Sequence, residues 1–172
     1  MNKNIVKNAG LTVWRGYKVC VVPINFKLYL QIDICCRVLR EETFLETLRS
    51  EQYKNYTPNE ISNEFLGTPI VMRYGNNKIY HIEEINYNLN PTKTFYHEKE
   101  KGEISYIDYY KKNYNITIKD KIQPLVKVIT EKSKIINQGE QREVIKYGYM
   151  IPELFSLTGM SDDQIKDHKV MQ

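Results

Sequence analysis

The sequence has few cysteines and no pattern of residues that would hold a metal ion. The three cysteines are Cys20, Cys35 and Cys36, an odd number without a Cys-x-x-Cys pair. The three histidines are scattered along the chain at His81, His97 and His168. We therefore expect neither a disulfide framework nor a metal site, and reduced thiols favour a cytoplasmic or nuclear location, or both.

The chain also lacks long apolar segments and a large excess of either charge. No apolar run approaches the length of about 18 residues that a membrane span needs, so no membrane partner is expected. The 25 basic and 21 acidic residues leave a net charge of +4, which is compatible with an RNA partner but does not require one. A chain of 172 residues with 41% hydrophobic content predicts one compact domain with flanking segments.

Tyrosine, by contrast, is abundant and concentrated in one stretch. Eight of the 14 tyrosines lie within residues 74–114, at positions 74, 80, 87, 96, 106, 109, 110 and 114. Phenol rings beside a few lysines are a common means of holding single-stranded nucleic acid, because the ring stacks on a base and the hydroxyl donates a hydrogen bond. A tyrosine-rich β-core would have the same composition, so this pattern alone leaves both interpretations open.

The first half of the chain predicts two hairpins separated by two helices. Alternating apolar and polar residues predict strands at 17–22 and 27–35, the second of them half-buried. Helices are expected over 41–53 and from Pro58, where Thr57 and Glu60 form a capping box, to Gly67. A second hairpin is expected from 68–74 and 78–84 through Gly75-Asn76-Asn77. Residues 1–10 are expected to be loose.

The second half predicts a small hairpin, an aromatic helix and further strands. The small hairpin is expected at 94–96 and 103–105, with His97 in an exposed turn, and a helix is expected over 106–114. On that helix the tyrosines at 106, 109, 110 and 114 share one face, which suits either a clamp or a miniature core. Strands are expected at 122–129 and 144–151, a mobile loop at 130–143, and short helices at 152–157 and 161–169. Together these elements predict a mainly β fold with α, a small OB-like or SH3-like β-barrel with an inserted hairpin–helix appendage.

The order of these motifs resembles the PAZ domain of the Argonaute family. A hairpin ends in Lys78-x-Tyr80, an Asn-Pro-x-x-Thr-Phe turn ends at Phe95, and Tyr-Tyr-x-x-x-Tyr ends at Tyr114. The segments 74–80 and 107–115 resemble the Piwi branch in particular, and 151–159 resembles the segment that closes the domain. The resemblance covers roughly residues 11–172.

The resemblance implies a site that holds the 3′ end of a guide RNA. Tyr80, Tyr109 and Tyr114 would contact the phosphate that joins the last two nucleotides, with Lys78 as the nearby cation. Phe95 would flank the terminal base or ribose, and Met150 and Ile151 would form an apolar floor for a 2′-O-methyl group. Arg73, near a position where many Argonautes carry a histidine, would either contact phosphate or lie on the surface. Tyr74, Tyr106 and Tyr110 are expected to pack.

The resemblance also implies a domain plan and a set of partners. Residues 1–37 would be the end of a preceding linker with the first strands, 38–157 the PAZ domain with its appendage at about 94–115, and 158–172 the start of the following linker. The partners would be a small guide RNA of the Piwi-interacting type and the remaining domains of a longer parent protein.

Two other classes of function compete with RNA binding. A metal-dependent nuclease would need clustered carboxylates or an activated nucleophile, and the sequence has no such cluster, so we expect no enzyme and no cofactor. A protein-interaction barrel could instead bind a peptide at a strand edge, and would have no affinity for short RNA.

Overall fold

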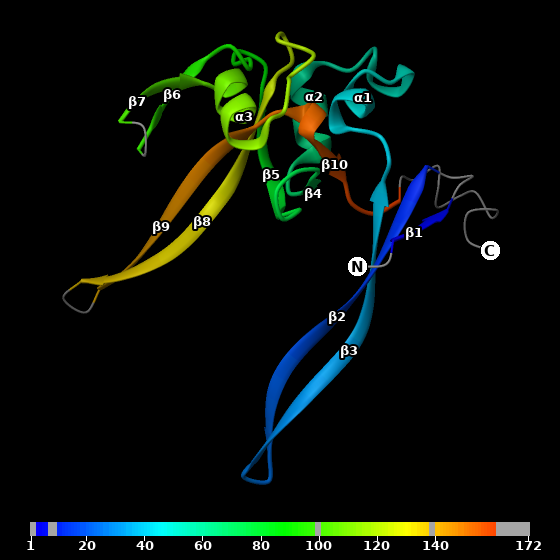
Figure 1. Cartoon of the computed structure of the whole chain (residues 1–172), viewed down its shortest axis with the longest axis vertical. Coiled ribbons are helices and arrows are strands. Elements are labelled where there is room, and N and C mark those ends of the chain that lie inside the picture. The colour runs from blue at the N-terminus through cyan, green and yellow to red at the C-terminus, as the bar shows by residue number, and fades with distance from the viewer. Residues whose placement is uncertain (1–2, 7–9, 99–100, 138–139, 161–172) are drawn as a thin grey trace. The chain divides into compact units, whose positions relative to one another are not determined.

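The computed structural model describes residues 3–6, 10–98, 101–137 and 140–160. The chain divides into two compact units, which we call the core unit (residues 43–157) and the ribbon unit (residues 1–42 and 158–172). Strands predominate, and the helices are short, so the expected mainly β fold with α is confirmed (Figure 1). Every described helix is too short or too polar to cross a membrane.

The ribbon unit contains a three-stranded antiparallel sheet, in the order β1 (Lys3–Val6), β2 (Leu11–Ile24) and β3 (Lys27–Arg40). β2 and β3 pair along their whole lengths. Asn25 and Phe26 close this hairpin with φ angles of 49° and 60°, the left-handed conformation of a tight two-residue turn. The expectation that residues 1–10 are loose is wrong for β1, because its backbone pairs with β2.

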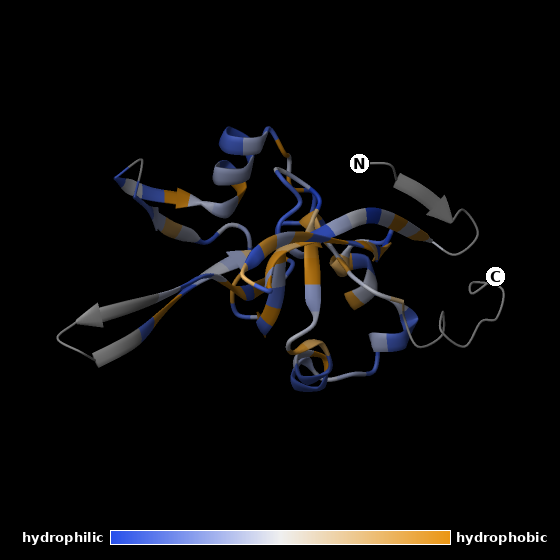
Figure 2. Ribbon diagram, turned by 90° about the horizontal axis from the view of Figure 1, so that it is seen from below, coloured by the Kyte–Doolittle hydropathy of each residue, from blue (hydrophilic) through white to orange (hydrophobic). Residues whose placement is uncertain are grey.

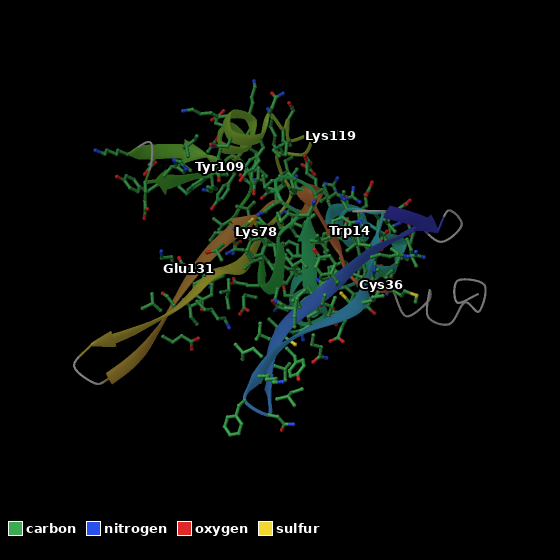
Figure 3. The ribbon with its side chains drawn as sticks, turned by 60° about the horizontal axis from the view of Figure 1, so that its bottom comes forward. Trp14, Cys36, Lys78, Tyr109, Lys119 and Glu131 are labelled. Atoms are coloured by element: carbon green, nitrogen blue, oxygen red, sulfur yellow. The ribbon has the colours of Figure 1, made fainter. Side chains whose placement is uncertain are left out.

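In the outer part of the β2–β3 hairpin, from residue 17 to residue 34, one face is entirely apolar. Residues directly opposite one another lie on the same face of an antiparallel pair. The resulting ribbon face consists of Tyr17, Val19, Val21, Pro23, Leu28, Leu30, Ile32 and Ile34. Apart from the proline, these side chains are 45% to 88% exposed, and Figure 3 shows side chains standing off the hairpin along its length. The expected half-buried strand is therefore wrong, because alternation assigns residues to a face without supplying a second layer to cover it.

Two capped helices open the core unit. Thr43 accepts a hydrogen bond from the Glu46 backbone N–H, and the Glu46 carboxylate accepts one from the Thr43 N–H at 2.6 Å. This box starts α1 (Phe44–Leu48), which ends earlier than the helix expected over 41–53 and is followed by the 3₁₀ turn η1 (Glu51–Tyr53). Thr57 and Glu60 repeat the box at α2 (Pro58–Phe65), which confirms the predicted second helix.

The core unit is built on one five-stranded antiparallel sheet. Its strand order is β10 (Phe155–Leu157), β4 (Pro69–Met72), β5 (Ile79–Asn86), β8 (Leu125–Asn137), β9 (Glu140–Met150). Phe44 from α1 packs between Phe65 and Phe155, with ring centroids 5.0 and 5.3 Å away. Figure 2 shows hydrophobic and hydrophilic residues alternating along many of the strands, as expected for a sheet with one face in the core.

The expected closed barrel is not confirmed. Within the described ranges the sheet is open, because no pairing joins the edge strands β9 and β10. β10 has only three residues and pairs with β4 alone, so it is too short to carry a continuous ladder across to β9. The core lies between this open sheet and the helices α1 and α2.

Two segments near the end of the core unit differ from the sequence-based expectation. The predicted mobile loop at 130–143 is largely two strands, since β8 and β9 pair from Val126 opposite Met150 to Asn137 opposite Glu140. The polar composition of this segment suits a solvent-exposed ribbon as well as it suits a loop. The helix expected over 152–157 is one 3₁₀ turn, η2 (Pro152–Leu154), followed by β10. The helix expected over 161–169 lies outside the described residues.

The appendage follows β5 and agrees with the prediction. β6 (Thr94–His97) pairs with β7 (Gly102–Ser105), and α3 (Tyr106–Tyr114) starts directly after β7. The loop after α3 is held by Glu153, whose carboxylate accepts hydrogen bonds from the backbone N–H groups of Lys119 and Asp120 and from the Gln123 side chain. This network fixes α3 to the body of the core unit, because Gln123 is itself buried.

Candidate functional site

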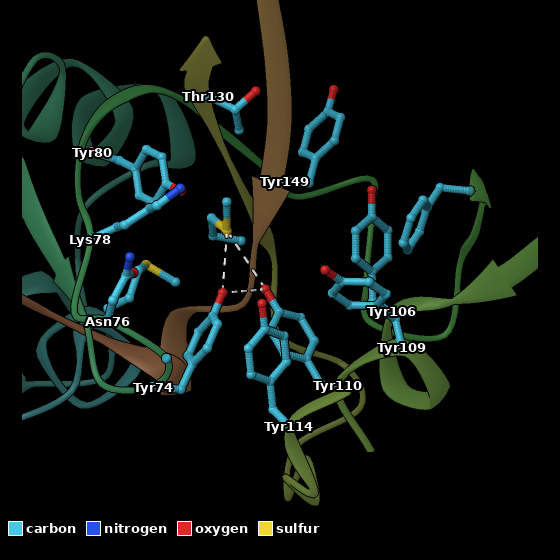
Figure 4. Close-up of a pocket in the computed structure, with 14 residues that line it drawn as sticks. Tyr74, Asn76, Lys78, Tyr80, Tyr106, Tyr109, Tyr110, Tyr114, Thr130 and Tyr149 are labelled. Atoms are coloured by element: carbon cyan, nitrogen blue, oxygen red, sulfur yellow. Dashed lines mark hydrogen bonds between the residues drawn. The ribbon is translucent and has the colours of Figure 1, made fainter. Parts of the chain in front are cut away.

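A cavity of about 320 Å³ opens in the core unit, and aromatic rings form most of its wall. The rings come from the turn before β5, from β5 and β6, from α3 and from β9 (Figure 4). The lining residues are Met72, Tyr74, Gly75, Asn76, Lys78, Tyr80, Phe95, Tyr106, Tyr109, Tyr110, Tyr114, Thr130, Tyr149 and Met150. Among the described residues, the wall therefore combines flat apolar surfaces with hydroxyl groups, one amide and one amine, without a carboxylate.

The helix α3 presents four of these tyrosines because its ends are fixed locally. The Ser105 hydroxyl accepts a hydrogen bond from the Asp108 backbone N–H at 3.1 Å, which caps the first turn. Asn115 ends the helix in the left-handed conformation, with φ of 54°. Tyr110 is 2% exposed and belongs to a core cluster with Leu125 and Ile151. One ring thus anchors the helix, and the others remain at the cavity.

The turn between β4 and β5 forms the opposite wall. Gly75 and Asn77 have φ angles of 60° and 52°, as predicted from residues that tolerate the left-handed region. The Gly75 backbone passes close to the Tyr114 ring, since a Cβ placed on Gly75 would lie 3.6 Å from Tyr114 Cε1. The Tyr74 and Tyr114 ring centroids are 4.6 Å apart. The turn and the helix therefore meet through tyrosine rings.

Three polar atoms meet at the base of the cavity. The Tyr74 and Tyr110 hydroxyl oxygens are 3.0 Å apart, and the Met150 sulfur lies 3.7 and 3.6 Å from them (Figure 4). Two phenol protons serve these three contacts, so one hydroxyl donates to the other and the second donates to sulfur. This arrangement holds Met150 with its thioether at the cavity.

Burial raises the pKa of three phenols of the cavity, Tyr80, Tyr106 and Tyr109. Desolvation raises the pKa of Tyr106 to about 12, with Tyr149 adding to the effect. Desolvation, reinforced by the neighbouring Tyr114, raises the pKa of Tyr109 to about 12. Burial also raises the pKa of Tyr80, again with a contribution from Tyr114. At neutral pH these groups are hydrogen-bond donors without charge, which suits a negatively charged ligand.

The structure brings together six of the eight residues selected from the sequence. Tyr80, Tyr109, Tyr114, Lys78, Phe95 and Met150 all line the cavity. Lys78 is exposed, and Figure 4 shows its side chain next to the Tyr80 ring. The remaining two, Arg73 and Ile151, lie elsewhere. Arg73 Nε donates to Ser156 Oγ at 2.8 Å, and Ile151 is fully buried in the core cluster around Tyr110.

Sequence reasoning missed several residues of the wall. Thr130 was expected in a mobile loop, and it reaches the cavity because β8 continues past it with an irregular register. Two of these residues could have been predicted from the sequence. Tyr149 lies directly before Met150, and Asn76 lies within the predicted turn. Tyr74, Tyr106 and Tyr110 pack as expected, and they line the cavity as well.

The sequence suggested that His97 lies in an exposed turn, and this expectation is wrong. It belongs to β6, is half-buried, and its ring centroid lies 5.4 Å from that of Tyr109. Its Nδ1 atom is buried without a hydrogen-bond partner among the described residues. His97 thus supports Tyr109 from behind and is not itself part of the cavity wall. Within the described ranges, no three histidine, cysteine or acidic side chains converge to hold a metal ion.

Comparison with known proteins agrees with this architecture. The sequence profile of the PAZ domain matches residues 42–172. Protein argonaute-3 of Drosophila melanogaster is 36% identical over 170 residues, which cover 98% of this chain and 19% of that protein. Piwi-like protein 3 of Homo sapiens is 31% identical over 166 residues, which cover 95% of this chain and 18% of that protein.

A solved structure has the same fold. The crystal structure of Drosophila Piwi superposes with a TM-score of 0.54 at 22% identity, over 98% of this chain and 18% of that one. The chain belongs to the PAZ domain family. The relatives that it matches are argonaute and Piwi-like proteins. It spans about a fifth of the length of the curated relatives it matches.

Proposed function

We propose that this domain binds the free 3′ end of a single-stranded guide RNA in the aromatic cavity. The observation that carries the proposal is the wall itself, where neutral tyrosines from α3 face tyrosine and lysine from β5 and the turn before it. A cavity of about 320 Å³ falls at the small end of the range for ligand pockets, which suits the end of a strand. Membership of the PAZ family supports the same conclusion.

The phosphate between the last two nucleotides is the group that the hydroxyls would hold. Tyr80, Tyr109 and Tyr114 each supply one donor and no charge that must be neutralised. Lys78 would add the single cation as a point charge. Phe95 packs against Tyr106 with ring centroids 4.6 Å apart, so it would offer a rigid apolar surface to the terminal base or ribose.

Met150 would contact a 2′-O-methyl group on the last ribose. Its thioether is held at the cavity by Tyr74 and Tyr110. A methyl group buried against this surface gains on the order of 1 kcal/mol. A 2′-hydroxyl in the same place gains less from Met150, because a thioether sulfur is only a weak hydrogen-bond acceptor. We therefore expect methylated ends to be tolerated or mildly preferred.

The proposed role is retention of the RNA without chemistry on it. The wall supplies phenols, a lysine amine and a thioether, and this set lacks the carboxylates that a nuclease metal site needs. We also propose that the core unit carries the RNA site and that residues 1–37 belong to a linker from the rest of the parent protein. The bound RNA and the other domains of that protein would then be the partners.

The test is the dependence of binding on the 3′ end. Fluorescence anisotropy with a 5′-labelled single strand should give saturable binding for a free 3′ hydroxyl, and the affinity should survive a chelator. A strand of the same sequence with a 3′-phosphate should bind at least about tenfold more weakly, because the added charge and bulk would have to be buried among the rings of the wall. Equal affinity for both strands would overturn the proposal.

The methylated strand provides a second arm. A strand with a terminal 2′-O-methyl group should bind as tightly as the unmodified strand or up to about fivefold more tightly. An unmodified strand that binds at least about tenfold more tightly than the methylated one would refute the apolar contact while leaving 3′-end binding intact.

A further inference from the structure

An extra residue interrupts the ladder of strand β8 beside the cavity. Ile129 pairs with Tyr147 and Glu131 pairs with Lys146, so Thr130 between them has no partner on β9. This is the geometry of a β-bulge. The Thr130 hydroxyl donates to the backbone carbonyl of Lys146 at 3.1 Å. That hydrogen bond fixes the side chain and leaves its methyl group directed toward β9.

Gly148 on β9 occupies the place that the Thr130 methyl needs. A Cβ added to Gly148 would lie 2.7 Å from Thr130 Cγ2, closer than carbon atoms approach without a clash, and 3.7 Å from Met150 Cε. The φ angle of Gly148 lies outside the left-handed region. The glycine is therefore required for space and not for its backbone conformation.

The two residues that a side chain at Gly148 would meet, Thr130 and Met150, both belong to the cavity wall. Thr130 and Met150 line the aromatic cavity, and Thr130 and Tyr80 also line a second cavity. A side chain at position 148 would force Thr130 off its hydrogen bond or push β9 away from β8. Either movement would shift Met150, whose sulfur lies within hydrogen-bond distance of the Tyr74 and Tyr110 hydroxyls.

We infer that Gly148 is a positioning residue for the RNA site. Its missing side chain lets the Thr130 methyl pack against β9, and this packing sets Thr130 and Met150 at the depth that the end of the strand requires. The inference rests on the proposed function. It adds that the shape of the wall depends on the contact between Gly148 and Thr130. Thr130 lines the cavity, whereas Gly148 would not touch the ligand.

The test uses a clash and its relief. Gly148→Ala should weaken binding of the free-ended strand by about tenfold, as expected when a packed site is overfilled. Thr130→Ser removes the clashing methyl and keeps the hydroxyl that donates to Lys146, so its own affinity is the reference for the double variant. The double variant Gly148→Ala with Thr130→Ser should bind within about threefold of Thr130→Ser.

A readout without RNA separates this inference from the proposed function. The chain has five methionines, and the Met150 methyl resonance can be assigned in a methyl-labelled protein with Met150→Leu. Gly148→Ala should shift that resonance, and adding Thr130→Ser should bring it back. If the wild type fails to bind free-ended RNA while the resonance behaves in this way, the proposed function fails and the positioning by Gly148 stands.

Two results would overturn the inference. The first is wild-type affinity and an unmoved Met150 resonance in Gly148→Ala. The second is a double variant that is as impaired as Gly148→Ala, since the Thr130 methyl would then not be the cause. If Gly148→Ala does not fold, the double variant decides, because relief of the clash should restore folding and a second unfolded protein would refute the pairing.

Discussion

The aromatic cavity and the ribbon face are both concentrations of apolar side chains on antiparallel hairpins, and they differ in what those side chains can select. The cavity rings touch one another, are mostly half-buried, and carry hydroxyls that point into a preformed hollow. The ribbon face is mostly aliphatic, and its side chains are 45% to 88% exposed. The first surface can distinguish a ligand by shape and hydrogen bonds, whereas the second offers only apolar area.

This difference shows that apolar exposure alone does not mark a ligand site. Rings that pack against one another keep their positions in the absence of ligand, so less conformational entropy is lost when the ligand binds. The two surfaces can be separated by substitutions that should affect one and leave the other unchanged.

Stability should distinguish the two units most strongly. Phe44 is fully buried between Phe65 and Phe155, so Phe44→Ala should lower the free energy of unfolding by about 3–5 kcal/mol. Phe26 at the tip of the ribbon is 110% exposed, so Phe26→Ala should change it by less than about 0.5 kcal/mol. Urea unfolding followed by circular dichroism measures both, and similar costs for the two variants would contradict the description of the core.

RNA affinity should show the next largest difference. Tyr109→Ala combined with Tyr114→Ala removes two rings of the wall, and each ring that contacts a base or sugar is worth roughly 1–3 kcal/mol, so affinity should fall at least about 30-fold. The matched control is Leu30→Ser with Ile32→Ser on the ribbon face, which should bind like the wild type. Anisotropy titrations of all three proteins provide the comparison, and a loss of affinity in the ribbon variant would place the RNA site elsewhere.

Discrimination of the terminal ribose should respond to Met150 by a smaller amount. Met150→Gln keeps a long side chain and an acceptor for the tyrosine hydroxyls, but it removes the apolar contact. Any preference for a 2′-O-methyl end should then fall by about fivefold, the equivalent of roughly 1 kcal/mol. The ratio of the two dissociation constants is the measurement, and Met150→Leu should preserve it. An unchanged ratio in the glutamine variant would exclude Met150 from the contact.

The weakest effect concerns pH. The pKa of Tyr106 and of Tyr109 is raised to about 12, whereas an unperturbed tyrosine titrates near about 10. The unfolded chain therefore loses these protons first, and stability should fall only as pH rises from about 10 to about 12. Between about pH 6 and about pH 9, tyrosine ionisation should leave both stability and RNA affinity unchanged.

Denaturant melts and anisotropy titrations across this range test that expectation. Tyr109→Phe is the control, since it removes one of the raised groups and should reduce the loss of stability above about pH 10. A steep fall in RNA affinity well below that pH would show that another group controls binding.

Much of the local structure could be read from the sequence. The capping box of Thr57 and Glu60 placed the start of α2, and the tyrosine run predicted α3 with the observed bounds. The turn at residues 75–77 could also be predicted, because Gly75 and Asn77 tolerate the left-handed conformation that they adopt. Each of these signals acts within a few residues, so no distant contact was needed to decide it.

The sequence by itself therefore determined the helices α2 and α3, the turn before β5, the apolar and polar faces of the strands, and most of the rings that form the cavity. Only the tertiary structure decided which face is covered and which neighbour in the chain reaches the cavity. Met150 lines it while Ile151 enters the core, and Thr130 reaches it through a bulge. The physical reason is that adjacent residues of a strand point in opposite directions, so a shift of one position in the pairing between strands exchanges wall and core.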